Sequence, residues 1–65
     1  MRIADTLAEM IKNTEITLLT KKRRKEIKVY VCDIWNGATI VAWYTNRFGE
    51  DTIGHFDVNE YDIVL

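Results

Sequence analysis

Apolar residues near the start of the chain recur at the spacing of one face of an α-helix, with charged residues mostly on the other side. The apolar side carries Ile3, Leu7, Met10 and Ile11. Thr6–Glu9 has the form of a capping box, although Ile3 indicates an earlier start, and Asn13 is a suitable stop. Because so short a helix does not persist alone in water, we expect it to dock on another element.

From Glu15 onward the pattern changes to runs rich in β-branched residues, which are typical of strands. These runs predict strands at residues 15–20, 26–35, 38–45, 52–58 and 61–65, separated by polar or glycine-containing turns. The sequence therefore predicts a single α+β domain over residues 1–65. Its short N-terminal helix packs on a four- to five-stranded antiparallel meander sheet, either open or curled toward a small barrel.

The dipeptide Asn36-Gly37 predicts a two-residue hairpin, because a type I′ turn needs a positive φ at both central residues. That turn fixes a register. One face pairs Trp35 with Ala38, Asp33 with Ile40, Val31 with Ala42 and Val29 with Tyr44; the other pairs Ile34 with Thr39, Cys32 with Val41 and Tyr30 with Trp43. Both faces are largely apolar, whereas a sheet with one wet face alternates between apolar and polar. One helix covers one face, so the second is enclosed by curling or covered by something else.

Size and composition point to a partner. A chain of 65 residues builds only a marginal core, and such proteins usually add a disulfide, a metal or another subunit. The one cysteine, Cys32, allows no internal disulfide, and the one histidine, His55, lies in no metal-binding motif. We therefore expect a homo-oligomer or a protein partner, with no cofactor and no metal. The charged N-terminus and the free thiol predict a cytoplasmic protein without a membrane span.

The five consecutive cations Lys21, Lys22, Arg23, Arg24 and Lys25 are a candidate binding site for a partner or an anion. The alternative interpretation is a solvated turn whose positive charge is complemented by the acidic residues of 48–65, a segment that contains no Lys or Arg. The overall net charge of −1 does not favour nucleic acid, and the tract itself holds no aromatic residue for base stacking. Nucleic-acid binding through residues 21–25 remains the second hypothesis.

Aromatic residues on both sides of the hairpin are the candidate interaction face: Tyr30, Trp35, Trp43 and Tyr44. Some of them must fill the core beneath the helix, and the remainder are suited to anchor a protein contact. Asp33 needs a partner only if its face is buried. The group of Asp57, Glu60 and Asp62 matches no metal loop.

Enzyme activity and a small-molecule substrate are not expected. Cys32 is interpreted as a small hydrophobic strand residue and His55 as a half-exposed one, and no phosphate loop or catalytic motif is present. In size and style the chain resembles the small stand-alone viral proteins of bacteriophages and those of mobile elements. We therefore expect a regulator, inhibitor or adaptor that acts by binding a macromolecule.

Overall fold

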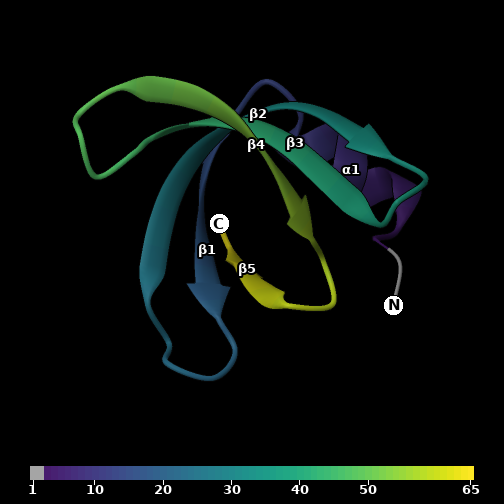
Figure 1. Ribbon diagram of the computed structural model, residues 1–65. Helices are drawn as coiled ribbons and strands as arrows, with labels where there is room; N and C mark the ends of the chain where they lie inside the picture. Colours follow the sequence, from purple (N-terminus) through teal and green to yellow (C-terminus); the bar gives the residue numbers. More distant parts are fainter. Residues whose placement is uncertain (1–2) are drawn as a thin grey trace.

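The computed structural model describes residues 3–65, which form one helix and five antiparallel strands (Figure 1). The helix α1 spans Asp5–Ile11, and the sheet consists of β1 (Glu15–Thr20), β2 (Glu26–Trp35), β3 (Thr39–Thr45), β4 (Asp51–Asp57) and β5 (Tyr61–Val64). The predicted α+β class is thus confirmed in broad terms, with little helix and an open sheet. All five strands lie within one residue of their predicted bounds.

The last strand does not continue the predicted meander, and that part of the prediction is wrong. The strand order is β4-β3-β2-β1-β5, so β5 pairs with β1 rather than with β4. The sheet bends strongly, and the link after β4 carries the chain to the opposite edge (Figure 1). Val58 fixes this link, because its side chain is buried and its amide donates to the carbonyl of Ala38. Val58 therefore anchors the link that precedes the final strand.

The helix begins later than Ile3 and without the capping box. Ala4 is its N-cap, and no side chain caps the first turn. The helix is followed by Asn13, whose φ of 60° lies in the left-handed region, as expected for a stop residue. Hydrogen bonds then tie this end to β2, since the amide of Asn13 donates to the carbonyl of Val31 and the amide of Val31 donates to Thr14. The helix is thereby held at one end of the curled sheet, where Ile11 is fully buried.

The core lies on the inner, concave side of the sheet. Its members come from the helix region and from β1 to β4, together with the link: Ile3, Ile11, Ile16, Leu18, Val29, Val31, Ile40, Ala42, Phe56 and Val58. An aromatic series extends it, because the ring of Phe56 makes edge-to-face contacts with Tyr44 on β3 and Tyr61 on β5. Curling therefore encloses one apolar face of the sheet and leaves the other outside.

A β-bulge in β2 changes the predicted hairpin register. Asn36 and Gly37 form the turn with φ values of 55° and 65°, and Tyr30 lies opposite Trp43, as predicted. The register shifts between Val31 and Asp33, so that Cys32 has no cross-strand partner in β3. The predicted pairs closer to the turn are therefore wrong: the structure pairs Asp33 with Val41, Ile34 with Ile40 and Trp35 with Thr39.

The physical reason lies outside the hairpin. The amide of Ala38 donates to the carbonyl of Trp35 across the turn, but the carbonyl of Ala38 accepts the amide of Val58, beyond β4, instead of a partner in β2. The extra residue in β2 absorbs this difference, and such a bulge also increases strand twist and bending. One consequence matters for function: Ile34 turns to the inner face beside Ile40, and Trp35 joins Tyr30 and Trp43 on the outer face.

Candidate functional site

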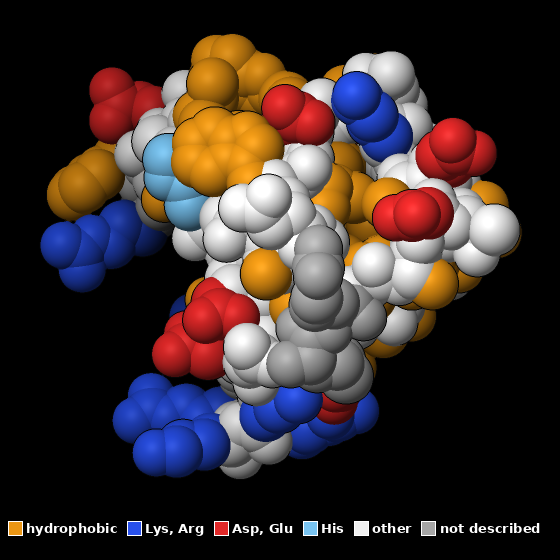
Figure 2. Space-filling view, turned by 90° about the vertical axis from the view of Figure 1, so that its right-hand side faces the viewer, with side chains coloured by type: hydrophobic (Ala, Val, Ile, Leu, Met, Phe, Trp, Pro, Cys, Tyr) orange, Lys and Arg blue, Asp and Glu red, His pale blue; other side chains and the backbone are white. Residues whose placement is uncertain are grey.

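The outer face of β2, β3 and β4 carries an exposed apolar surface that we call the outer patch: Tyr30, Trp35, Trp43, Ile53 and His55. The register aligns Tyr30, Trp43 and Ile53 in one row across the three strands. These three side chains are 46%, 44% and 47% exposed, and Trp35 is 50% exposed. The ring of Trp35 lies 5.0 Å from that of His55, so the patch is continuous along the strands. Figure 2 shows hydrophobic side chains gathered around the single histidine at the top of that view.

Acidic residues border the outer patch. The register places Glu15 beside Tyr30, Asp33 beside Val41, Asp51 beside Thr45 and Asp57 beside Thr39. Asp33 lies 3.7 Å from the ammonium of Lys12, with both side chains about half exposed. The carboxylates of Asp51 and Asp57 accept hydrogen bonds from the Thr45 hydroxyl and the Asn59 amide. The outer patch therefore has an aromatic centre and a predominantly negative rim.

A cleft opens where β2 and β3 separate. Their pairing begins at Tyr30 opposite Trp43, whereas β2 continues along β1 to Glu26 and β3 continues along β4 to Thr45. Two hairpins therefore diverge, the β1–β2 hairpin downward and the β3–β4 hairpin to the left in Figure 1. We call the space between them the inter-hairpin cleft.

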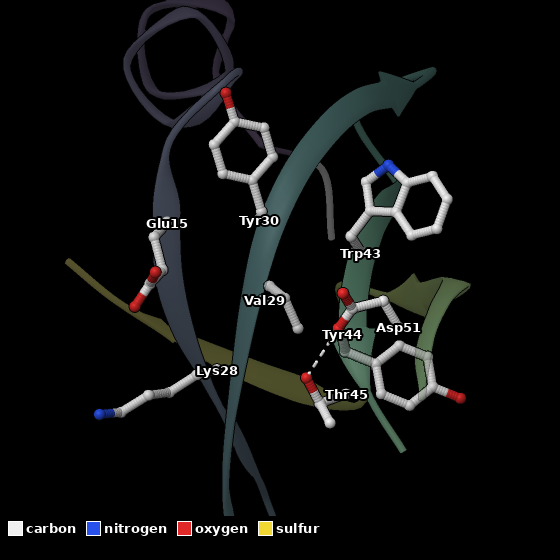
Figure 3. A pocket seen from close by; sticks show the side chains of 8 residues that line it. All are labelled: Glu15, Lys28, Val29, Tyr30, Trp43, Tyr44, Thr45 and Asp51. Atoms are coloured by element: carbon white, nitrogen blue, oxygen red, sulfur yellow. Dashed lines mark hydrogen bonds between the residues drawn. The ribbon is translucent and has the colours of Figure 1, made fainter. Parts of the chain in front are cut away.

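The apex of the inter-hairpin cleft is a cavity of about 340 Å³ (Figure 3). Tyr30 and Trp43 flank its upper end, and Lys28 and Thr45 lie below them on opposite strands. Toward the hairpin tips the cleft widens to about 670 Å³. Residues of both hairpins line this mouth: Lys25, Glu26, Ile27, Lys28, Tyr44, Thr45, Asn46, Arg47 and Phe48.

The basic tract of residues 21–25 forms the tip of the β1–β2 hairpin, and all five of its residues are exposed. Thr20 orders this loop, because its hydroxyl and its carbonyl accept the amides of Lys25 and Arg24. The guanidinium of Arg24 forms an ion pair with Asp62 on β5, the strand beside β1. Acidic side chains accordingly lie directly above the basic ones at the bottom of Figure 2. One of the five cations is thus complemented within the molecule, and Lys25 lines the inter-hairpin cleft.

The four predicted interaction aromatics divide between the two faces. Tyr30, Trp35 and Trp43 lie on the outer face, whereas Tyr44 is half-buried against the core and also lines the cleft. Two of the three outer aromatics, Tyr30 and Trp43, stand at the apex of the cleft. The structure therefore places Tyr30, Trp43, Tyr44 and the basic Lys25 around the cleft, whereas Trp35 lies beyond it on the outer patch.

Cys32 and His55 have different neighbours, and no contact joins them among those described. The Cys32 sulfur lies 3.8 Å from the carbonyl oxygen of Tyr30, and the His55 ring faces Trp35. Cys32 is half-buried rather than fully buried, and His55 is exposed. Among residues 3–65, no group of three His, Cys, Asp or Glu side chains is arranged to hold a metal ion.

Sequence reasoning missed two parts of the site. Ile53 and His55 belong to the outer patch, and their alternation with the inward Phe56 along β4 is the signal that could have found them. Arg47 and Phe48 lie at the second hairpin tip, where Phe48 is 73% exposed. The presence of an apolar phenylalanine beside an arginine in the turn Asn46–Gly49 was the signal that could have indicated an exposed binding residue.

Comparisons of the chain with protein-family models, with curated proteins and with solved structures find no match. No helix within residues 3–65 has the length and apolar character needed to cross a membrane. The outer patch and the inter-hairpin cleft are therefore the two surfaces whose geometry bears on function.

Proposed function

We propose that this protein is a small non-enzymatic interaction module, a regulator, inhibitor or adaptor, that binds a partner protein through the outer patch. The observation that carries the proposal is the exposure of three aromatic side chains and Ile53 on one continuous face. Trp and Tyr dominate the binding energy of protein interfaces, because large rigid rings bury much apolar area. The bulge at Cys32 supports this reading, since it brings Trp35 to the same face as Tyr30 and Trp43.

The charges of the rim support a partner with a basic surface. Glu15, Asp33, Asp51 and Asp57 border the patch, so a complementary surface has an apolar centre edged by Lys and Arg. Cations from such a surface can also lie over the exposed indole rings. A second copy bound through the same face would bring one acidic rim against another. The charges therefore favour a different protein as the occupant.

The test is affinity capture from a lysate of the producing cells, treated with nuclease, followed by binding measurements with the purified captured protein. The variant is Trp35→Ala combined with Ile53→Ser, because neither side chain lines the inter-hairpin cleft. Met10→Ser is the matched control, since Met10 is 64% exposed on α1 and is not a member of the outer patch. We expect the double variant to weaken binding by at least about 30-fold, the loss typical of a hot spot, and the control to bind like the wild type.

Salt dependence supplies the second readout. A partner that complements the acidic rim should associate more slowly as salt rises, with little change in dissociation. Equal binding by the double variant and the wild type would exclude the outer patch as the interface. An association rate that is independent of salt would exclude a partner with a basic rim.

A further inference from the structure

We propose that the inter-hairpin cleft is a binding site for single-stranded nucleic acid. The mouth of this cleft lies apart from the outer patch, although Tyr30 and Trp43 at its apex belong to both, and the proposal does not depend on a protein partner. The cleft is built by the fold itself, because β2 and β3 stop pairing at Tyr30 and Trp43 while each continues along its other neighbour. Its mouth is an open hollow of about 670 Å³ between the two hairpin arms.

Cations face this mouth from both arms. Lys28 lies in β2, Lys25 lies in the turn before β2, and Arg47 lies in the β3–β4 turn. Glu26 is the one acid among the residues that line the mouth. This local excess contrasts with the net charge of −1 for the whole chain. Of the other tip cations, Arg24 pairs with Asp62, and Lys21 and Lys22 line a separate hollow beside Glu60. Phosphate groups are the ligands that such clustered Lys and Arg side chains attract.

An exposed aromatic ring completes the site. Phe48 is 73% exposed at the tip of the second arm, and the Arg47 guanidinium lies 5.1 Å from its ring centroid. The side-chain oxygen of Asn46 accepts the amides of Phe48 and Glu50, so the loop that presents the ring is ordered by hydrogen bonds. A base can stack on this ring while its phosphates contact the cations, which is how proteins bind single strands. The second arm thus supplies the aromatic residue that the basic tract lacks.

The acidic side chains around the cleft also favour binding of a single strand over binding of a duplex. Glu15 and Asp51 line the apex, and the outer face beyond it carries Asp33 and Asp57. A rigid duplex lying across the hairpins would meet these carboxylates. A flexible strand can instead follow the mouth of the cleft, where Lys25, Lys28 and Arg47 lie. We therefore expect a marked preference for single-stranded over double-stranded probes.

The test measures fluorescence anisotropy of labelled oligothymidylate and oligouridylate of about 12 nucleotides, within the usual site size of small single-strand binders. A duplex of equal length and an oligoglutamate peptide serve as competitors. The titrations run from about 50 to 200 mM salt, over which phosphate contacts weaken measurably. Comparing the two labelled probes distinguishes DNA from RNA as the ligand.

Two variants separate the contributions. Lys25→Ser with Arg47→Ser should lower the slope of log affinity against log salt by roughly 0.7 for each lost phosphate contact. Phe48→Ala should weaken binding by roughly 5- to 150-fold and leave that slope unchanged, because stacking involves no counterion release. Lys12→Ser is the control: it removes one charge, but Lys12 lies on the helix side, beside Asp33. Circular dichroism should show all three proteins folded, since the replaced residues are exposed.

Three results would overturn the proposal. One is the absence of single-strand binding by the wild type at about 50 mM salt. Another is equal affinity of the cleft variants and the Lys12→Ser control. The third is displacement of the labelled strand by oligoglutamate as effectively as by unlabelled strand, which would assign the cleft to an acidic peptide.

Discussion

The packing of Gly54 allows one prediction to be worked out in full. Gly54 lies in β4 opposite Ala42, and a Cβ atom at this position would sit 2.7 Å from Cε1 of Tyr44 and 3.1 Å from two ring atoms of Phe56. Carbon atoms at ordinary contact are about 3.5 to 4 Å apart, so Gly54→Ala forces a displacement of roughly 1 Å. The Tyr44 ring cannot easily turn away, because it packs edge-to-face on Phe56, which in turn packs on Tyr61.

The expected magnitude follows from two opposing effects. Overpacking of this kind typically destabilises by about 1 to 3 kcal/mol. Replacing glycine by alanine also restricts the unfolded chain, which stabilises the native state by about 0.4 to 1 kcal/mol. Taking the middle of each range, we expect Gly54→Ala to lower the free energy of unfolding by about 1.3 kcal/mol. For a domain of this size, the melting temperature should fall by roughly 5 to 10 °C.

The assay is thermal and urea unfolding followed by circular dichroism, in a double-mutant cycle with Tyr44→Leu. Removing the Tyr44 ring removes the shortest of these contacts and leaves those to Phe56, so Gly54→Ala should be better tolerated in the Tyr44→Leu background than in the wild type. Gly49→Ala is the matched control, because its φ of 79° strains a side chain while no neighbouring atom lies within 4 Å. It should destabilise without coupling to Tyr44. An unchanged melting temperature for Gly54→Ala, or additivity with Tyr44→Leu, would refute the packing argument.

Two further predictions concern charge. Arg24 and Asp62 should show a coupling energy of about 0.2 to 1 kcal/mol in a double-mutant cycle of unfolding, because both side chains are about half exposed. That coupling should shrink in about 1 M salt, and its persistence there would contradict a screened surface pair. Sedimentation measures the self-association expected from the marginal core, and a stable monomer at micromolar concentration would remove that expectation. A dimer formed through the outer patch should strengthen as salt screens its acidic rims, whereas a salt-weakened dimer would point to another surface.

Local features of the chain were sufficient to predict its elements. The strands at 15–20 and 26–35 have the predicted bounds, and Asn36 and Gly37 adopt positive φ values at the turn. Each of these features depends on the conformational preference of a few neighbouring residues. The predicted pairing of Tyr30 with Trp43, at the end of the hairpin far from the turn, was correct, although the pairs nearer the turn are shifted. Local sequence also marked the basic tract and the aromatic residues as candidates.

Tertiary structure alone decided how these elements meet. The bulge at Cys32 accompanies a hydrogen bond between Val58 and Ala38, which lie twenty residues apart in the chain. The pairing of β5 with β1 is likewise set by the bend of the whole sheet and by the buried Val58. Neither contact leaves a local pattern, because each depends on where distant segments arrive after folding.

The candidate sites divide in the same way. The sequence identified Tyr30, Trp35 and Trp43, but only the bulge places all three on the outer face. The basic tract was visible, whereas the inter-hairpin cleft and its second wall at Arg47 and Phe48 exist only because β2 and β3 separate. Residue types are fixed by the sequence, and which of them share a surface is fixed by long-range pairing and curvature. For this chain, the sequence determined the side chains available for binding, and the fold decided which of them act together.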